Sequence, residues 1–379
     1  MSGVYIHIPF CHYKCTYCDF YFSVSTKSLD ALISAILKEI ENRRHYLSTP
    51  KLNTIYLGGG TPSILDLSVL ERIFCQMAKY FEWDEDSEIT IECNPEDINE
   101  GYLMGLKEMG INRISLGVQS LNDKVLKWMG RNHGAAQSIE SIRLIQKSGI
   151  ENFSVDLIYG VPDYDLKSLE KDIEYLLQVA PIPHISAYQL TVEPKTQLHY
   201  LVKKRCINLK EEEELAEEFL MIQEKLQSRG YDHYEISNYA QKGFISKHNL
   251  AYWLQKPYLG IGPSAHSYNG YERQWNVCNN YLYAQYVQNN KKYYDSEILT
   301  VHQQYNEYVY TRLRTKYGCH LDEIQQYFGE YYVRYFLKVY DSVAEYFKVD
   351  RAHRMYVLDP HKGFLLADKL ASEFFVISM

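Results

Sequence analysis

Residues 11–18 read Cys-His-Tyr-Lys-Cys-Thr-Tyr-Cys, which places three thiols at Cys11, Cys15 and Cys18. They directly follow residues 4–10, a short apolar run with the sequence Val-Tyr-Ile-His-Ile-Pro-Phe. Run and cysteines together predict a strand that ends in a loop, with the thiols gathered where the strand stops. Thiolates in a loop bind soft metals, and three of them with no fourth cysteine close by favour an iron–sulfur cluster with one open iron.

Other interpretations of these cysteines are weaker. Small buried cysteines do not fit a segment this polar. A thioredoxin-type dithiol would use only two of the three thiols, and covalent haem attachment through C-x-x-C-H fails because Asp19 follows the last cysteine. A zinc-binding structural protein stays open, since His7 or His12 could supply a fourth ligand.

Composition limits the class of protein. A chain of 379 residues suggests more than one domain, and 46% apolar residues can build sizeable cores. The net charge of −8 argues against a general nucleic-acid surface. The remaining cysteines are scattered singly, nothing at the N-terminus resembles a signal peptide, and no apolar run approaches a membrane span. We therefore expect a cytoplasmic protein whose thiols bind metal rather than form disulfides.

Short apolar runs alternate with helical patterns up to about residue 190. The predicted strands are 4–8, 54–57, 88–93, 113–117, 152–157 and 184–189, and the predicted helices are 28–46, 67–81, 100–109, 135–148 and 166–179. Such alternation predicts an α/β fold in which helices cover a parallel sheet. Polar or glycine residues after the strand ends favour a (β/α) barrel, although a doubly wound open sheet would alternate in the same way.

The later part of the chain has a different pattern. A long helix over 209–229 precedes a segment rich in loops, and from about residue 300 three helical stretches, two short strands and a last helix over 362–375 suggest a compact α+β module of winged-helix type. We expect three parts: a barrel over 1–230, a loop-rich connecting segment over 231–300 and the C-terminal module over 301–379.

Several polar residues follow the predicted strands. Gly58-Gly59-Gly60-Thr61 comes directly after the second strand, and three glycines imply close approach of the backbone to another group. Glu92, Gln119 and Asp156 lie within or just after later strands. Since buried acids are rare unless paired, each suggests a polar contact near the mouth of the barrel. Arg131 could pair with one of them or with a carboxylate ligand.

Taken together, the cysteine triplet, the glycine run and the acids at the strand ends resemble the radical SAM superfamily. This resemblance implies a partial (β/α)6 barrel and a [4Fe–4S] cluster whose open iron binds S-adenosylmethionine (SAM). In such proteins the reduced cluster cleaves SAM to a 5′-deoxyadenosyl radical.

Within the superfamily the chain is similar to the branch that holds oxygen-independent coproporphyrinogen III dehydrogenases and haem chaperones, through motifs spread over nearly its whole length. By position, the resemblance implies SAM contacts at Tyr5, Tyr17, Gly60, Thr61, Glu92, Gln119, Arg131 and Asp156.

Two differences separate this chain from the dehydrogenases. They have a further cysteine where this chain has Phe20, and a longer segment before the position of Tyr5. The sequence His-Asn-Leu-Ala-Tyr-Trp at residues 248–253 resembles the H-N-x-x-Y-W motif that is linked with haem handling in the chaperones. The resemblance therefore implies haem contacts at His248 and Tyr252, with His266 as a weaker candidate.

We expect a haem chaperone that carries a [4Fe–4S] cluster and SAM and delivers haem to acceptor haemoproteins. Acceptors in membranes are compatible with this, although the chain itself shows no membrane segment. An electron donor for the cluster is also needed, which the sequence does not identify. The alternative is oxidative decarboxylation of coproporphyrinogen III in porphyrin biosynthesis.

Overall fold

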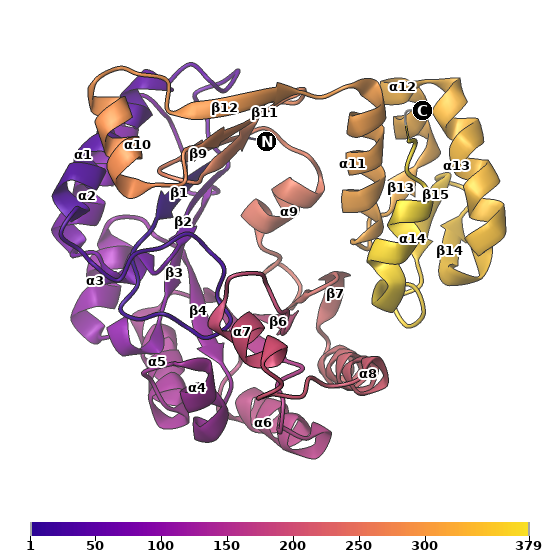
Figure 1. Cartoon of the computed structure of the whole chain (residues 1–379), viewed down its shortest axis with the longest axis horizontal. Coiled ribbons are helices and arrows are strands. Elements are labelled where there is room, and N and C mark those ends of the chain that lie inside the picture. Colours follow the sequence, from indigo (N-terminus) through magenta and orange to yellow (C-terminus); the bar gives the residue numbers. More distant parts are fainter. Residues whose placement is uncertain (1, 378–379) are drawn as a thin grey trace.

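The computed structural model describes residues 2–377, and within them six parallel strands pair in sequence order. These are β1 (Gly3–Ile8), β2 (Thr54–Gly59), β3 (Glu88–Cys93), β4 (Arg113–Gln119), β5 (Asn152–Tyr159) and β6 (His184–Gln189). Between them lie α1 (Leu29–Asn42), α2 (Leu67–Met77), α3 (Glu100–Glu108), α4 (Asp123–Met129), α5 (Ala135–Ser148) and α6 (Leu166–Val179). The helices lie along the outer side of a curved sheet (Figure 1). The predicted partial (β/α)6 barrel is confirmed.

The alternation of side chains along β1 shows how the barrel wall forms. Val4, Ile6 and Ile8 are fully buried in the apolar core. The intervening Tyr5 and His7 point to the opposite face, because successive strand residues alternate. On that concave face the ring of Tyr5 lies 6.0 Å from the ring of Tyr56. Apolar packing thus fixes one face of β1 and leaves the other for polar contacts.

The segment 231–300, which we expected to be rich in loops, extends the sheet at both sides. Its strands are β7 (Asp232–Glu235), β8 (Asn238–Ala240), β9 (Tyr258–Ile261), β10 (His266–Tyr268), β11 (Glu272–Asn276) and β12 (Tyr294–Ile298). β9 pairs in parallel with β1, and β8 pairs antiparallel with β6. Over the described residues the order becomes β12-β11-β10-β9-β1-β2-β3-β4-β5-β6-β8-β7. The prediction missed these strands because they are short and separated by Gly, Pro and Asn.

Further helices pack around this extended sheet. They are α7 (Gln197–Lys203), α8 (Glu212–Ser228), α9 (Lys247–Trp253) and α10 (Asn280–Gln288). Figure 1 shows α9 on the concave side of the sheet, between the strands and the C-terminal module.

Residues from 301 onward form an α+β module, as the winged-helix-like prediction requires. Its helices are α11 (Val301–Leu313), α12 (Leu321–Phe328), α13 (Glu330–Val343) and α14 (Ala367–Glu373), and its antiparallel sheet has the order β13 (Cys319–His320), β15 (Met355–Leu358), β14 (Phe347–Asp350). The last helix is shorter than the predicted 362–375. Across residues 2–377 no helix has the length and apolar character that crossing a bilayer demands.

A buried carboxylate joins α1 to the added strands. Glu39 is fully buried and accepts hydrogen bonds from the Gly262 amide at 2.8 Å, the Asn276 side chain at 2.8 Å and the Tyr283 hydroxyl at 2.5 Å. The Arg43 guanidinium lies 3.6 Å from the same carboxylate. Glu39 therefore compensates a buried charge and satisfies donors from three segments of the 231–300 region.

Glu39→Ala should strongly destabilise the fold, because it leaves Arg43 as an uncompensated buried charge with several unpaired donors nearby. We expect the free energy of unfolding to fall by about 3–5 kcal/mol. Urea denaturation followed by circular dichroism measures it. Glu41→Ala, an exposed position on the same helix, is the control and should change stability by less than about 0.5 kcal/mol. Equal effects of the two substitutions would contradict this role of Glu39.

Candidate cluster and SAM site

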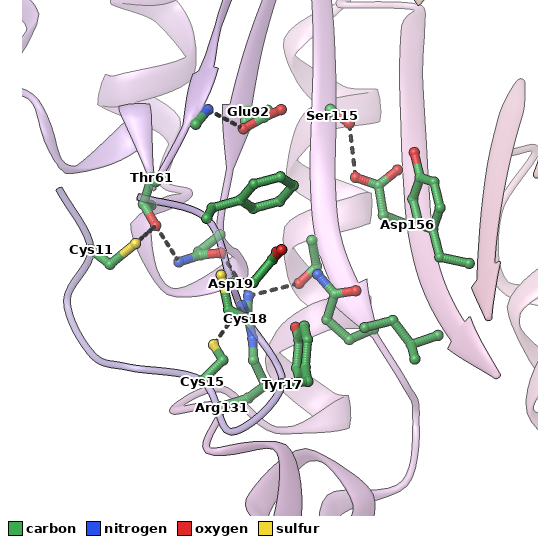
Figure 2. Close-up of a pocket in the computed structure, with 18 of the residues that line it drawn as sticks. Cys11, Cys15, Tyr17, Cys18, Asp19, Thr61, Glu92, Ser115, Arg131 and Asp156 are labelled. Carbon is green, nitrogen blue, oxygen red and sulfur yellow. Dashed lines mark hydrogen bonds between the residues drawn. The ribbon is translucent and has the colours of Figure 1, made fainter. Parts of the chain in front are cut away.

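A cavity of about 420 Å³ opens at the carboxyl ends of the parallel strands. Cys11, Cys15 and Cys18 line it from the loop between β1 and α1, and Glu92 and Asp156 line it from β3 and β5. Figure 2 shows the cysteine loop on one side of the cavity and the two carboxylates on the strands behind it. One cavity thus combines soft sulfur donors with polar groups on rigid strands.

The cysteine loop is held by its backbone. The Thr16 amide donates to the Met129 carbonyl at 3.0 Å, and the Thr16 carbonyl accepts from the Leu198 amide at 2.8 Å. Farther along, His7 Nε2 lies 3.1 Å from the Tyr21 carbonyl. Because a carbonyl only accepts, this nitrogen carries the proton, and the other ring nitrogen accepts from the Tyr5 hydroxyl at 3.0 Å. The loop is therefore fixed to α4, α7 and β1 at separate points.

The arrangement of donors does not suit a single zinc ion. Among the described His, Cys, Asp and Glu side chains, no three surround one point as a mononuclear metal requires. Of the two possible fourth ligands, His7 has partners at both ring nitrogens. A [4Fe–4S] cluster binds each thiolate through a different iron, so it needs sulfurs that are farther apart. The donor set fits the cluster better than zinc.

Burial favours the protonated form of two thiols of the cysteine loop, Cys11 and Cys18, in the metal-free protein. It raises the pKa of Cys11 to about 11 and that of Cys18 to about 12, while the Thr61 hydroxyl, 3.5 Å from Cys11 Sγ, lowers the former in part. Iron binding must therefore displace protons from these thiols.

The glycine run brings β2 against the cysteine loop. The Gly60 amide donates to the Ile8 carbonyl at 2.9 Å, and a Cβ at Gly60 would lie only 2.5 Å from the Phe10 carbonyl. Gly59 has a φ of +112°, which favours glycine. In this conformation its amide donates to Glu92 Oε2 at 3.0 Å. The run is needed both to approach the loop and to hold Glu92.

Glu92 accepts a second hydrogen bond, from the Tyr56 hydroxyl to Oε1 at 2.8 Å. Burial raises the pKa of Glu92 to about 7, although the hydrogen bonds from Tyr56 and Gly59 oppose this rise. The group is thus poised to change charge near neutral pH.

Gln119 and Arg131 also line the cavity, and Arg131 lies beside Cys15. Gln119 has a φ of +68° next to a break in the pairing of β4 with β5, a strained conformation for a residue other than glycine. Arg131 donates to Asn94 Oδ1 at 2.6 Å and to the Gly117 carbonyl at 3.0 Å, and lies 3.6 Å from Cys15 Sγ. A fixed positive charge here suits a carboxylate ligand bound near the cluster.

Asp156 has unused hydrogen-bonding capacity. Its Oδ2 accepts from the Ser115 hydroxyl at 2.8 Å, whereas the buried Oδ1 has no partner in the described part of the chain. Tyr17 and Thr61 also line this cavity. An unpaired buried carboxylate oxygen fits a ligand that offers hydroxyl groups, such as the ribose of SAM.

Three predicted site residues lie away from the cavity. Tyr5 packs behind Tyr56 and its hydroxyl contacts His7. His248 and Tyr252 lie on α9, and His248 Nδ1 is 2.8 Å from Thr54 Oγ1, at the first residue of β2. These two residues are therefore at the amino ends of the strands, opposite the cysteines.

Other residues of the cavity were not predicted from the sequence, above all Tyr56, Asn94 and Tyr188. Each belongs to or directly follows a predicted strand, and strand alternation could have placed Tyr56 on the same face as Glu92. Phe20, singled out only as a difference, also lines the cavity and is 67% exposed.

Comparisons with known proteins agree with this geometry. A family model described as "Radical SAM superfamily" matches residues 5–176. Two curated relatives match nearly end to end, and both are named "Heme chaperone HemW". The protein of Lactococcus lactis is 32% identical over 98% of this chain and 97% of its own length, and that of Bacillus subtilis is 34% identical over 99% of each. Coproporphyrinogen III oxidase (HemN) from Escherichia coli, described as a radical SAM enzyme, has a TM-score of 0.83 at 22% identity, covering 98% of this chain and 89% of that one. This last match shows the fold alone.

The cavity and the domain match define a radical SAM protein. The chain belongs to the HemW family within this superfamily. Membership of the superfamily implies a [4Fe–4S] cluster and SAM. The residues present fit both groups, because the cysteine loop offers three thiols to the cavity, and the cavity also holds the positive charge of Arg131 and an unpaired oxygen of Asp156.

Replacing any one of Cys11, Cys15 or Cys18 by Ala should remove most of the bound iron, because the remaining two thiolates cannot hold a cluster. Iron and sulfide analysis after anaerobic reconstitution measures this. Cys75→Ala and Cys319→Ala are the controls, one exposed and one buried. Full iron content in all three cluster variants, or loss of iron in the controls, would overturn the ligand assignment.

Glu92→Gln should change how stability depends on pH. The folded wild type keeps a proton on Glu92 up to about pH 7, whereas in the unfolded chain this carboxyl has its ordinary pKa of 4.5. The wild type therefore loses stability as pH rises between these values, and glutamine does not. In scanning calorimetry without SAM, the Tm of the variant minus that of the wild type should become more positive from about pH 5 to pH 8. The exposed Glu151→Gln serves as control; a constant or falling difference for Glu92→Gln would contradict the prediction.

Proposed function

We propose that this protein is a haem chaperone, which binds haem and delivers it to acceptor haemoproteins. The observation that carries the proposal is the match with relatives named "Heme chaperone HemW" over at least 97% of both chains. A match of that extent includes the cysteine loop, the cavity and the segment with the H-N-x-x-Y-W motif. We further propose that the protein works in the cytoplasm.

The alternative is a radical enzyme that decarboxylates coproporphyrinogen III. The likeness to the fold of HemN supports it only at the level of architecture. Phe20 argues against it, since the dehydrogenases that the chain resembles have a cysteine at this position. The exposed phenyl group of Phe20 in the cavity wall cannot donate a proton or bind metal as a thiol can.

The residues of the cavity have separate tasks when the cofactors are bound. The cluster and SAM supply one-electron chemistry; the protein supplies binding and orientation. Cys11, Cys15 and Cys18 would hold the cluster, and Arg131 would pair with the SAM carboxylate. Glu92 and Asp156 would accept hydrogen bonds from SAM, including those of the ribose hydroxyls. Gln119, held in a strained conformation at the strand end, would complete the polar wall.

The haem contacts proposed at His248 and Tyr252 require α9 to move. His248 is 2% exposed, and its Nδ1 and Nε2 contact Thr54 and the Tyr252 hydroxyl at 2.8 and 2.9 Å. Iron ligation by this imidazole would break one of these hydrogen bonds. Haem binding at this site therefore implies an opening of the segment that contains α9.

Haem titration of anaerobically reconstituted protein tests the proposal. We expect a Soret band that saturates with haem for the wild type, and affinity lowered at least about tenfold in His248→Ala, because an iron ligand is worth at least this much. His353→Ala, which removes an exposed histidine of the C-terminal module, is the control and should bind haem like the wild type.

A parallel assay with coproporphyrinogen III, SAM and a reductant separates the two functions. The proposal expects no decarboxylation. Conversion of the porphyrinogen with 5′-deoxyadenosine formed in step, together with no haem binding by the wild type, would establish the enzyme instead.

A further inference from the structure

A buried carboxylate holds the N-terminal end of α9 at the amino ends of the parallel strands. Glu88, the first residue of β3, accepts hydrogen bonds from the amides of Lys247 and His248, each at 2.9 Å. The carboxylate is 3% exposed, and Arg113 of the neighbouring strand lies 4.0 Å away. These contacts fix the beginning of the H-N-x-x-Y-W segment against the amino ends of β2, β3 and β4.

From this anchor the side chain of His248 extends along the concave face of the sheet. Its ring stacks on the Tyr56 ring, with centroids 4.9 Å apart and planes inclined by 24°. The ring of Tyr252 packs edge-on against the same imidazole at 4.8 Å. The orientation of the imidazole is thus fixed by packing as well as by its two hydrogen bonds.

Tyr56 connects this packed group to the SAM site. Its ring face lies on His248, and it also lines the cavity, where its hydroxyl donates to Glu92 at 2.8 Å. The opposite oxygen of Glu92 is held by the Gly59 amide. Of the two donors to Glu92, only the Tyr56 hydroxyl belongs to a side chain whose position depends on α9.

We propose that His248 is a positioning residue for the SAM site, which acts through Tyr56 to hold Glu92 in the orientation that SAM requires. The H-N-x-x-Y-W segment then has a function in the closed structure that is independent of haem. Its effect on SAM is transmitted by one stacking contact and one hydrogen bond.

A consequence follows if the proposed haem function also holds, and it rests on that function. A haem iron that takes His248 as ligand would pull the imidazole from Tyr56 and loosen Glu92. Because coupling between two sites is reciprocal, haem would weaken SAM binding and SAM would weaken haem binding by the same factor.

The test is the dissociation constant of SAM, measured by equilibrium dialysis on anaerobically reconstituted protein without haem. Tyr56→Phe keeps the ring on His248 but removes the hydrogen bond to a carboxylate, and should raise Kd roughly tenfold.

His248→Ala removes the stacking and should raise Kd roughly fivefold. His248→Phe restores a ring but no iron ligand, and should bring Kd back to within about twofold of the wild type. In the double variant Tyr56→Phe/His248→Ala, Kd should rise by less than the product of the two single rises, because both substitutions act on Glu92.

Tyr283→Phe is the matched control. It also removes a hydroxyl from a buried glutamate, Glu39, but outside the SAM cavity, so it should lower stability and leave Kd unchanged. Iron content is measured for every variant to exclude loss of the cluster. A wild-type Kd in His248→Ala, a wild-type Kd in Tyr56→Phe, or an equal rise in Tyr283→Phe would overturn the positioning role. Absence of haem binding by the wild type would refute only the haem function, since the SAM measurements contain no haem.

Discussion

The two hydrogen bonds that hold Glu92 are the contacts on which the rest of the site depends. To deliver the Gly59 amide, the end of β2 must adopt a positive φ, and this requires glycine. The next residue, Gly60, then lies directly against the backbone of the cysteine loop, where no side chain would fit. The backbone at Gly59 and Gly60 therefore fixes the position of the Glu92 carboxylate relative to the cysteine loop. Side-chain substitutions at the glycines would disturb both parts of the site together.

The two ends of the parallel strands have different tasks. The carboxyl ends form the cavity, as in other barrels, and the amino ends are closed by α9. Glu88 anchors that helix, and Trp253 at its end lies under the guanidinium of Arg314, 5.3 Å from the ring centre, which connects α9 to the C-terminal module. Tyr56 lies midway along β2, where it contacts Glu92 of the cavity and His248 of α9. The C-terminal module is thereby linked to the cavity through α9, which carries Trp253 at one end and His248 at the other.

Much of this could be predicted from the sequence, and the failures have physical causes. The strands β1 to β6 were predicted because their apolar runs are regular and end in glycine or polar residues, and the cysteine triplet was evident from spacing alone. The strands β7 to β12 were not predicted, because a strand of three to five residues is too short to show a clear alternation of apolar and polar residues. Their pairing partners are also set by the tertiary structure rather than by the local sequence. His248 was singled out by the H-N-x-x-Y-W motif as a haem contact, yet it is buried, because the nearby Thr54 and Tyr252 satisfy its nitrogens. Tyr56 was overlooked because strand alternation assigns the face on which it lies but not its hydrogen bond to Glu92.

EPR spectroscopy of the reduced, anaerobically reconstituted wild-type protein, with and without SAM, tests the central claim most directly. A cluster held by the three thiols of the cysteine loop has one iron open to SAM, in the cavity that Glu92 and Asp156 also line. We therefore predict a [4Fe–4S] signal whose g values shift when SAM is added. A cluster signal that stays unchanged at saturating SAM, or a protein that takes up zinc and no iron, would contradict it.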